Sequence, residues 1–286
     1  MTDTTATLPQ ASSALRAAPA PNAVLLQRTE VARGLAIFRV APRGWSLPRF
    51  VPGQYTTLGL LASALRMPGT DPDDPPLEPS RLIRKAYSIA SSSLEGEYLE
   101  FYIALVNSGV LTPRLFALGP GDALHLGTKI TGMFTLDQVP QSQNIVLLAT
   151  GTGVAPYMSM LRTLLGTLHD RRVVVVHGAN HSWDLGYHPE LGTMQRLCAW
   201  FSYVPIISVP QAEPVPWRGQ TGFLHDFWNG PERDKLFGFS PSADNTHVLL
   251  CGNPLMIEAM LATLMAQGYV EQVKKTPGQI HLERFW

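Results

Sequence analysis

Two glycines, Gly151 and Gly153, stand in a part of the sequence where a phosphate group can be bound. The stretch "LLATGTGVAP", Leu147 to Pro156, is an apolar strand pattern that enters a glycine turn and then a helical pattern. Such a turn points backbone N–H groups and the positive end of a helix at whatever lies beyond the strand, and a pyrophosphate fits there. Pro156 occupies the third glycine position of the G-x-G-x-x-G fingerprint. Because such turns also serve packing alone, this stretch by itself leaves both roles open.

Tyr87 and Ser88 form a second group of side chains that can do chemistry. They lie in "RKAYSIASS", Arg84 to Ser92, where a strand pattern follows two basic residues. A flat conjugated ligand can stack on the tyrosine ring while the serine hydroxyl bonds the edge of the ligand. The alternative is that Tyr87 is an ordinary core residue of a β-structure.

A third stretch, "NSGVLTPRLFALGPGD", predicts a short helix whose N-terminus can bind another anion. Thr112 can cap this helix, Pro113 suits its first position and Gly119 suits its end. The residues from Gly109 to Thr112 then place backbone N–H groups at the start of the helix. The sequence therefore predicts one phosphate-binding turn in each half of the chain.

The elements that must position these groups follow two patterns along the chain. Residues 24–137 consist of short β-type runs separated by glycine and proline turns, which predicts an antiparallel barrel or sandwich. From Asn144 onward, continuous apolar runs alternate with helical patterns, which predicts a doubly wound parallel sheet. We therefore expect an antiparallel β-barrel domain at 23–137 and an α/β domain at 144–286, with the boundary near 137–144.

Length and composition set further limits. The chain of 286 residues has a formal net charge of zero and a pI of about 7.1, so it has no overall basic surface for nucleic acid. No apolar run approaches the ~20 residues of a membrane helix. Its two cysteines, Cys198 and Cys251, exclude a four-cysteine iron–sulfur cluster within the chain. Residues 1–22 are interpreted as a disordered tail rather than a signal peptide, and the protein is expected to be cytoplasmic.

One segment does not fit the barrel pattern. The stretch "GTDPDDPPLEP", residues 69–79, contains four acids, four prolines and no base. This composition cannot form a core strand. We interpret the segment as a solvated loop inserted into the barrel, with a docking or regulatory role as the alternative.

His177, His181 and His188, together with Cys198, raise the question of a zinc site. Their spacing extends over a strand end, a turn and a helix, and does not match the ligand spacing of known zinc motifs. We therefore expect no metal site in this chain.

Taken together, the motifs resemble those of the ferredoxin–NADP reductase superfamily, and within it the compact bacterial ferredoxin/flavodoxin reductases. The resemblance runs from about Val24 to Trp286 and includes "PGQYTTLGL", "AYSIASS", "GVLTPRL", "GTGVAPYMSML", "HVLLCGNPLM" and the end "ERFW". It implies an FAD-binding antiparallel β-barrel followed by a domain that binds a nicotinamide nucleotide. It also implies hydride transfer between NAD(P)H and FAD, and single-electron transfer between FAD and ferredoxin or flavodoxin.

The resemblance also implies roles for individual residues. Tyr87 corresponds to the tyrosine that stacks on the isoalloxazine, and Ser88 to the serine near flavin N5. Cys251 and Gly252 are expected near the nicotinamide, and Trp286 against the flavin. The candidate catalytic residues are therefore Ser88, Cys251 and Trp286. The residues expected at the two pyrophosphates are Gly109, Val110, Leu111 and Thr112 for FAD, and Thr150, Gly151, Thr152 and Gly153 for the nicotinamide nucleotide.

The sequence departs from the family pattern at the basic residue of the R-x-Y-S motif. Lys85 stands at the arginine position, with Arg84 before it and Ala86 after it. Lysine can neutralise a phosphate but lacks the planar bidentate group of arginine. We expect the protein still to bind FAD. The sequence leaves open whether Arg84 or Lys85 contacts the pyrophosphate.

The positions that meet the 2′-phosphate of NADPH in the compact bacterial enzymes also differ. Asn180, Val209 and Phe223 stand where arginines are usual. A 2′-phosphate is normally recognised by charge-assisted hydrogen bonds, so we expect the preference for NADPH to be weak or reversed. Arg218 in the loop "PVPWRGQ" is the candidate to restore one contact, and the usual NADPH selectivity is the alternative.

The leading interpretation is an FAD-containing NAD(P)H reductase for ferredoxin or flavodoxin. The alternatives are the reductase component of an oxygenase, a free-flavin reductase and a non-catalytic FAD or nucleotide sensor. Between residues 23 and 70, six arginines against one acid give a local charge of +5. This balance predicts an acidic electron carrier that docks on the barrel.

Overall fold

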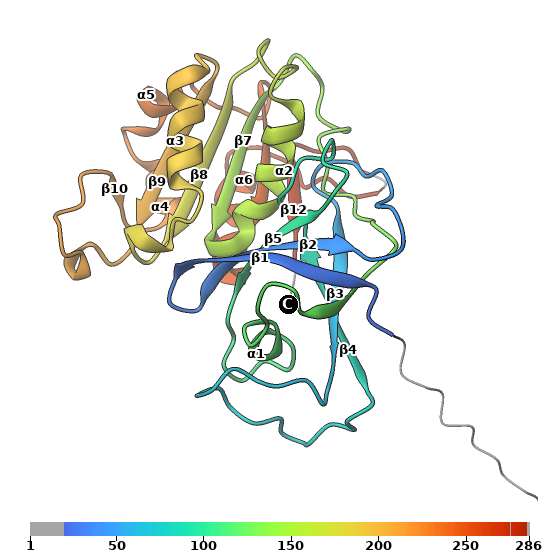
Figure 1. Cartoon of the computed structure of the whole chain (residues 1–286). Helices are drawn as coiled ribbons and strands as arrows, with labels where there is room; N and C mark the ends of the chain where they lie inside the picture. The colour runs from blue at the N-terminus through green and yellow to red at the C-terminus, as the bar shows by residue number, and fades with distance from the viewer. Residues whose placement is uncertain (1–19, 275, 285–286) are drawn as a thin grey trace, which may run out of the picture.

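The computed structural model describes residues 20–274 and 276–284. The predicted tail at 1–22 lies outside the described residues except for its last three, and the predicted flavin contact Trp286 lies outside them as well. Within these ranges the chain forms two six-stranded sheets, one antiparallel and one parallel (Figure 1). No helix in this part of the chain is long and apolar enough to cross a membrane.

The antiparallel sheet rolls into a barrel, with strands in the order β4-β3-β6-β1-β2-β5. Its two edges approach each other just beyond β4, where the Ala90 N–H donates to the Glu100 carbonyl at 2.8 Å. Alternating apolar side chains fill the interior, among them the fully buried Leu25, Phe38 and Leu58. The strands are β1 (Ala23–Ala32), β2 (Leu35–Pro42), β3 (Tyr55–Leu61), β4 (Leu82–Ser88), β5 (Leu99–Ala104) and β6 (Ala123–Leu126).

A single helical turn, α1 (Thr112–Leu115), lies at one end of the barrel and differs from the prediction. Leu111 precedes the first helical residue, and no side chain of the described chain caps the helix. The Thr112 hydroxyl instead accepts from the Val106 N–H at 3.0 Å and donates to the Val106 carbonyl. The helix ends at Leu115 rather than near Gly119. Because Leu111 and Leu115 are buried in the barrel core, packing rather than capping stabilises this turn.

The parallel sheet has the order β10-β9-β8-β7-β11-β12. The chain enters it at β7, builds outward through β8 and β9, and returns to the other side of β7 as β11. Ligands of such sheets bind beyond the carboxyl ends of the strands where the order reverses, which is here between β7 and β11. The strands are β7 (Asn144–Thr150), β8 (Val173–Ala179), β9 (Phe201–Ile207), β10 (Gln220–Thr221), β11 (Thr246–Cys251) and β12 (Ile280–Glu283).

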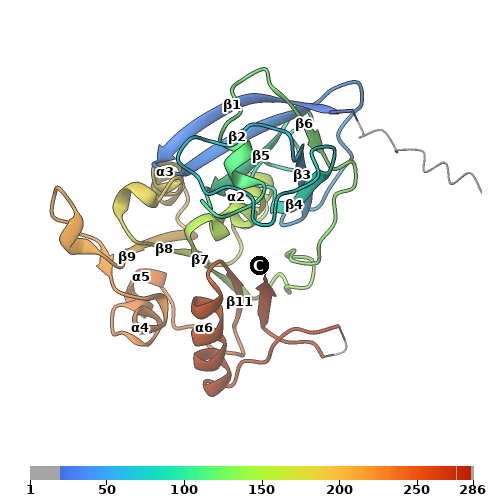
Figure 2. The same ribbon diagram turned by 90° about the horizontal axis from the view of Figure 1, so that it is seen from below.

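Helices cover both faces of the parallel sheet. α2 and α3 lie on the face toward the barrel, and α4, α5 and α6 lie on the opposite face (Figure 2). α6 has a side-chain cap, because Asn253 accepts from the Leu255 N–H at 2.8 Å and Pro254 occupies the first helical position. The helices are α2 (Ala155–Leu164), α3 (His188–Leu197), α4 (Leu224–Asn229), α5 (Arg233–Phe237) and α6 (Pro254–Ala266), with the 3₁₀ turns η1 (Gly151–Val154), η2 (Ser182–Asp184) and η3 (Pro210–Ala212).

One apolar cluster contains side chains of both the barrel and the parallel-sheet half. Leu35 and Tyr102 of the barrel are buried in the same cluster as the side chains beneath α2 and α3. The Tyr102 hydroxyl donates to the Asp184 carbonyl at 3.1 Å and accepts from the Gly186 N–H at 3.0 Å. A Cβ atom at Gly186 would come within 3.0 Å of the Tyr102 ring. This close packing fixes the relative position of the two halves and therefore the shape of the cleft between them.

Candidate active site

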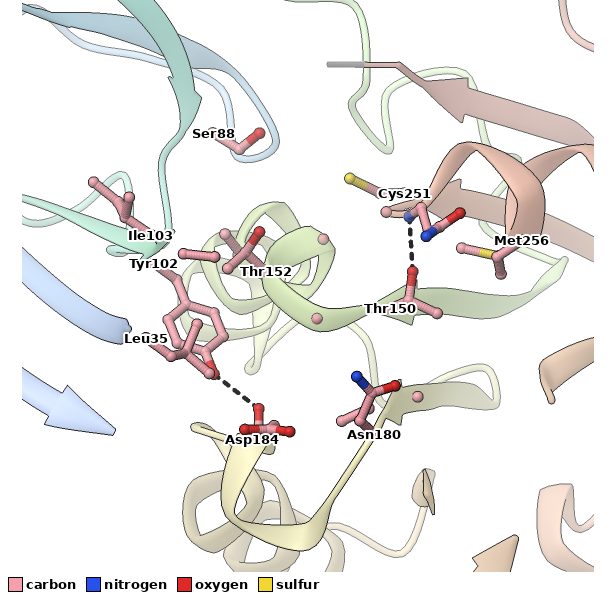
Figure 3. A pocket seen from close by; sticks show the side chains of 18 of the residues that line it. Leu35, Ser88, Tyr102, Ile103, Thr150, Thr152, Asn180, Asp184, Cys251 and Met256 are labelled. Carbon is pink, nitrogen blue, oxygen red and sulfur yellow. Dashed lines mark hydrogen bonds between the residues drawn. The ribbon is translucent and has the colours of Figure 1, made fainter. Parts of the chain in front are cut away.

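A cleft of about 960 Å³ lies between the barrel and the carboxyl edge of the parallel sheet. Its walls include the ends of β4 and β5 on one side and the ends of β7, β8 and β11 on the other. Figure 3 shows Ser88 and Tyr102 facing the loop after β7, with Asn180 and Cys251 beyond it. Most of the predicted site residues line this cleft, namely Ala86, Tyr87, Ser88, Thr112, Thr150, Gly151, Thr152, Gly153, Asn180, Cys251 and Gly252.

The loop after β7 has a shape suited to a pyrophosphate. Gly151 has a φ of 53°, which glycine adopts without strain. A Cβ atom on Gly153 would collide with the backbone carbonyl of Cys251, so the loop lies directly against the end of β11. The Thr150 hydroxyl accepts from the Asn253 N–H at 2.8 Å (Figure 3). The loop is therefore held between β7, β11 and the start of α6.

His177 supports this loop from within β8. Its side chain is fully buried, and its Nε2 donates to the Gly151 carbonyl at 2.9 Å. Burial lowers the pKa of His177 to about 4, so the ring is neutral at physiological pH. A neutral ring that donates from Nε2 carries no proton on Nδ1, which is buried without a hydrogen-bond partner in the described chain. His177 is thus suited to position the loop rather than to bind phosphate as a cation.

Tyr87 lies on the barrel wall of the cleft. Its ring packs edge-on against Phe101, with the ring centroids 6.4 Å apart, and the residue remains partly exposed at the cleft. Burial raises the pKa of the Tyr87 hydroxyl, so the phenol keeps its proton. The residue both borders the barrel core and lines the cleft, which makes the two interpretations from the sequence compatible.

Glu283, which the sequence analysis missed, forms a cluster with Ser88 and Cys251. Ser88 Oγ donates to Glu283 Oε2 at 3.0 Å, and Cys251 Sγ lies 3.7 Å from the same oxygen atom. Burial raises the pKa of the Glu283 carboxyl to about 8, although hydrogen bonds from the other two side chains partly offset it. Burial also raises the pKa of the Cys251 thiol. At neutral pH this end of the cleft therefore holds an uncharged thiol and a protonated carboxyl group.

The geometry of β4 distinguishes the two bases next to the tyrosine. Successive side chains of a strand point to opposite faces, so Lys85 shares the face of Tyr87 and Arg84 takes the other. The Arg84 side chain lies next to Gly59 and lines a separate cavity of about 210 Å³ together with Asn22. Neither base lines the main cleft directly. Of the two bases, Lys85 is the one on the strand face of Tyr87.

Of the four residues predicted at the FAD phosphate, only Thr112 lines the cleft. Gly109 and Val110 precede it in the turn, and Leu111 is buried in the barrel core. A Cβ atom on Gly109 would come within 3.0 Å of the Thr112 hydroxyl and of the Val106 carbonyl. A larger residue at this position would therefore crowd the turn.

The end of the cleft near β8 carries few charges. Asn180 lines it and accepts from the Ser208 hydroxyl at 3.1 Å. Phe223 also lines it, is 61% exposed and stacks on His225. Arg33, in the turn between β1 and β2, is the one lysine or arginine among the cleft-lining residues of the described chain.

The sequence matches known proteins over most of its length. The family model for an oxidoreductase NAD-binding domain matches residues 147–261. The flavodoxin/ferredoxin–NADP reductase of Escherichia coli (strain K12) is 31% identical over 254 residues, which cover 88% of this chain and 93% of that protein. The chain belongs to the ferredoxin–NADP reductase family.

Other members of the ferredoxin–NADP reductase family agree with this assignment. The ferredoxin–NADP reductase of Pseudomonas aeruginosa is 30% identical over 241 residues, covering 82% of this chain and 86% of that protein. A crystal structure of a ferredoxin NADP+ reductase from Neisseria gonorrhoeae with bound FAD and NADP is similar, with a TM-score of 0.78 and 22% identity. It covers 93% of this chain and 98% of its own. The predicted family and fold class are confirmed, and the roles of individual site residues stay predictions.

Proposed function

We propose that this protein is a flavoprotein reductase that moves electrons between NAD(P)H and a one-electron carrier such as ferredoxin or flavodoxin. The cleft is the observation that carries the proposal, because it brings the Tyr87–Ser88 end of β4 opposite the glycine loop of β7 and Cys251. A ring stacked on the tyrosine and a nucleotide bound at the loop would meet between the two halves of the protein. Family membership and the activity in the name of the E. coli relative support the same conclusion.

The residues present fit FAD and a nicotinamide nucleotide. When bound, FAD supplies a group that exchanges two electrons with the nicotinamide and one at a time with a carrier. On the barrel side, Tyr87 offers a stacking face, Lys85 offers a cation on the same strand face, and the turn at 109–112 offers backbone N–H groups. On the sheet side, a Cβ of Gly151 would meet no atom within 4 Å outside the loop itself, so the space next to this glycine is open.

Ser88, Glu283 and Cys251 would give the reaction centre a proton store. Because burial raises the pKa of Glu283 to about 8, its carboxyl group keeps a proton at neutral pH. Ser88 Oγ lines the cleft 3.0 Å from that carboxyl group and can pass a proton between it and the edge of a bound ring. Cys251 contacts the same carboxyl oxygen and helps to hold it in place.

The distribution of charge supports the use of NADH. Asn180 and Phe223, at two positions where relatives are expected to carry bases, both line the cleft and are both uncharged. Arg218, the candidate replacement, does not line the cleft. Two other basic residues line the cleft, Arg33 from the barrel and His225 from α4. We therefore infer that discrimination in favour of NADPH is weak or absent.

We propose an acidic electron carrier as the partner. The basic surface that this protein offers to such a carrier is smaller than the count of arginines between residues 23 and 70 suggested. Three of the six arginines between residues 23 and 70 pair with carboxylates, namely Arg28, Arg39 and Arg66. Arg43 and Arg49 are exposed and are the candidates to meet such a carrier. We also propose that the protein is cytoplasmic. Its two cysteines are free thiols, as is usual in a reducing compartment.

Anaerobic titration of the FAD-loaded protein with NADPH and with NADH tests the function. We expect at least one donor to bleach the visible flavin absorbance, and the reduced protein then to reduce ferredoxin or flavodoxin. A protein that binds FAD but is bleached by neither donor would be a sensor. Rapid reduction of added free flavin without reduction of either carrier would instead favour a free-flavin reductase.

A further inference from the structure

The insertion at 69–79 packs against the turn that precedes α1. Asp73 is 13% exposed and forms ion pairs with Arg66 and Arg114. Its Oδ1 lies 2.6 Å from Arg66 Nη1 and 3.1 Å from Arg114 Nη1. The side chain of Arg114, which belongs to α1, is only 3% exposed. The interpretation of the segment as a solvated loop therefore fails for Asp73, whereas the neighbouring Asp71 and Asp74 are exposed.

Arg66 extends this ion pair to the backbone of the turn. Its Nη2 donates to the Asn107 carbonyl at 3.3 Å and to the Gly109 carbonyl at 3.1 Å. The backbone of the insertion adds a contact, because the Asp71 N–H donates to the same Asn107 carbonyl at 3.1 Å. Two carbonyl groups of the turn are thus held toward the insertion.

Arg114 holds a third carbonyl in the same way. Its Nη1 donates to the Val110 carbonyl at 2.6 Å, while its Nη2 and Nε donate to the Ala62 carbonyl at 2.7 and 3.2 Å. In a planar trans peptide, the C=O group and the N–H group that follows it point in opposite directions. The N–H groups of residues 108, 110 and 111 therefore point away from the two guanidinium groups.

We propose that Asp73 is a positioning residue which, through Arg66 and Arg114, presents the N–H groups of this turn to the pyrophosphate of FAD. The inference rests on the proposed function, which places FAD at residues 109–112. Asp73 itself does not contact the cofactor and instead fixes the orientation of the peptide planes that do. A turn without this support would have to lose conformational freedom on binding, which weakens affinity.

Removal of the Asp73 charge separates this role from a purely electrostatic one. A carboxylate near a pyrophosphate repels it, so an electrostatic effect alone predicts that Asp73→Asn binds FAD more tightly. Loss of the ion pairs that hold Arg66 and Arg114 predicts weaker binding instead. The two explanations therefore predict opposite changes in the dissociation constant of FAD.

The dissociation constant of FAD, measured by flavin fluorescence on FAD-free protein, tests the proposal. The matched control is Asp71→Asn, which removes an exposed carboxylate from the same insertion and leaves the Asp73 ion pairs in place. We expect the constant to rise at least tenfold in Asp73→Asn and to stay within twofold in Asp71→Asn. An unchanged or lower constant in Asp73→Asn would overturn the proposal.

Hydrogen exchange provides a readout that does not depend on FAD. The Gly109 N–H donates to the Val106 carbonyl at 2.9 Å, and it should exchange at least fivefold faster in Asp73→Asn than in the wild type. If the wild type binds no FAD, the proposed function fails. The exchange rate of the Gly109 N–H in Asp73→Asn still shows whether Asp73 orders the turn. If Asp73→Asn does not fold, Arg66→Gln keeps the Arg114 pair and should raise the FAD constant about threefold. An unchanged constant in that variant would contradict the proposal.

Discussion

Arg162 Nη1 lies 2.7 Å from Glu100 Oε1, and this ion pair joins α2 of the parallel-sheet half to β5 of the barrel. Arg162 also donates to the carbonyl of Ala90, two residues beyond Ser88, at 2.9 Å. Its other two nitrogen atoms bond both carboxyl oxygens of Glu190 on α3. The helix that follows the predicted nucleotide loop is therefore tied directly to the end of the strand that carries the predicted flavin contacts.

Replacement of Glu100 by glutamine should loosen this junction. Glu100 is 2% exposed, and removal of one partner of a buried ion pair costs about 3 kcal/mol of the free energy of unfolding. We also expect kcat to fall more than KM changes, because a displacement of ~1 Å between reacting groups can cost about 100-fold in rate. Urea unfolding and steady-state kinetics measure the two effects.

Arg39→Gln is the matched control for this prediction. Arg39 pairs with the same Glu100 carboxylate from within the barrel, but its side chain is 40% exposed. Loss of an exposed partner should cost less than about 1 kcal/mol and leave kcat unchanged. Equal effects of Glu100→Gln and Arg39→Gln would show that the link to Arg162 has no special role.

Glu283→Gln should alter how the stability of the FAD-free protein depends on pH. The ordinary pKa of a glutamate is 4.5, whereas burial raises that of Glu283 to about 8. Between these values the folded protein binds one proton more than the unfolded chain, so the free energy of unfolding falls as the pH rises from about 4.5 to about 8. Glutamine does not ionise, so the variant should lack this decrease, which amounts to about 5 kcal/mol in the wild type.

Denaturant unfolding at a series of pH values measures this difference. Glu258→Gln on α6 serves as the control, because it removes an exposed carboxyl group and should follow the wild-type curve. His177 and His281 also have pKa values lowered to about 4 by burial, so their contribution is lost as the pH falls below about 6.5 in all three proteins. Parallel curves for the wild type and Glu283→Gln would mean that Glu283 ionises normally in the folded state.

Gly153→Ala should weaken binding of the nicotinamide nucleotide and leave FAD in place. The added Cβ would collide with the Cys251 carbonyl, so the loop must move away from β11. We expect the dissociation constant for NADP+ or NAD+ to rise at least tenfold, measured by calorimetry, with an unchanged FAD content. The control is Gly192→Ala within α3, where the nearest atom is the end of the Arg196 side chain at 3.7 Å. That variant should bind normally and be about 0.5–1 kcal/mol more stable.

The sequence predicted most elements of this fold because most of them carry a local pattern. The continuous apolar runs after Asn144 correspond to β7, β8, β9 and β11. The Thr112 cap was wrong because the hydroxyl finds the backbone of Val106 instead, a contact that depends on the path of the preceding turn. Propensity describes what a residue can do locally and cannot rank such competing partners.

Glu283 and Asp73 were missed for a related reason. Glu283 lies in β12, a strand of four residues at the edge of the sheet, too short for a periodic signal. Its partner Ser88 is 195 residues away in the sequence. Asp73 lies in a segment whose composition suggested solvent, yet it pairs with Arg114, 41 residues away. In each case the partner of the charged residue is set only by the tertiary fold.

The preference for a nicotinamide nucleotide can be changed by restoring charge to the cleft. In the double variant Asn180→Arg, Phe223→Arg, two guanidinium groups would enter the end of the cleft where Arg33 is now the one lysine or arginine among the described lining residues. Each charge-assisted hydrogen bond to a 2′-phosphate contributes about 1.5–3 kcal/mol, so the ratio of kcat/KM for NADPH to that for NADH should rise at least tenfold. Arg218→Ala is the control and should leave the ratio unchanged, because Arg218 does not line the cleft. A wild-type advantage for NADPH of a hundredfold or more, lost in Arg218→Ala, would refute the argument and identify Arg218 as the residue that binds the phosphate.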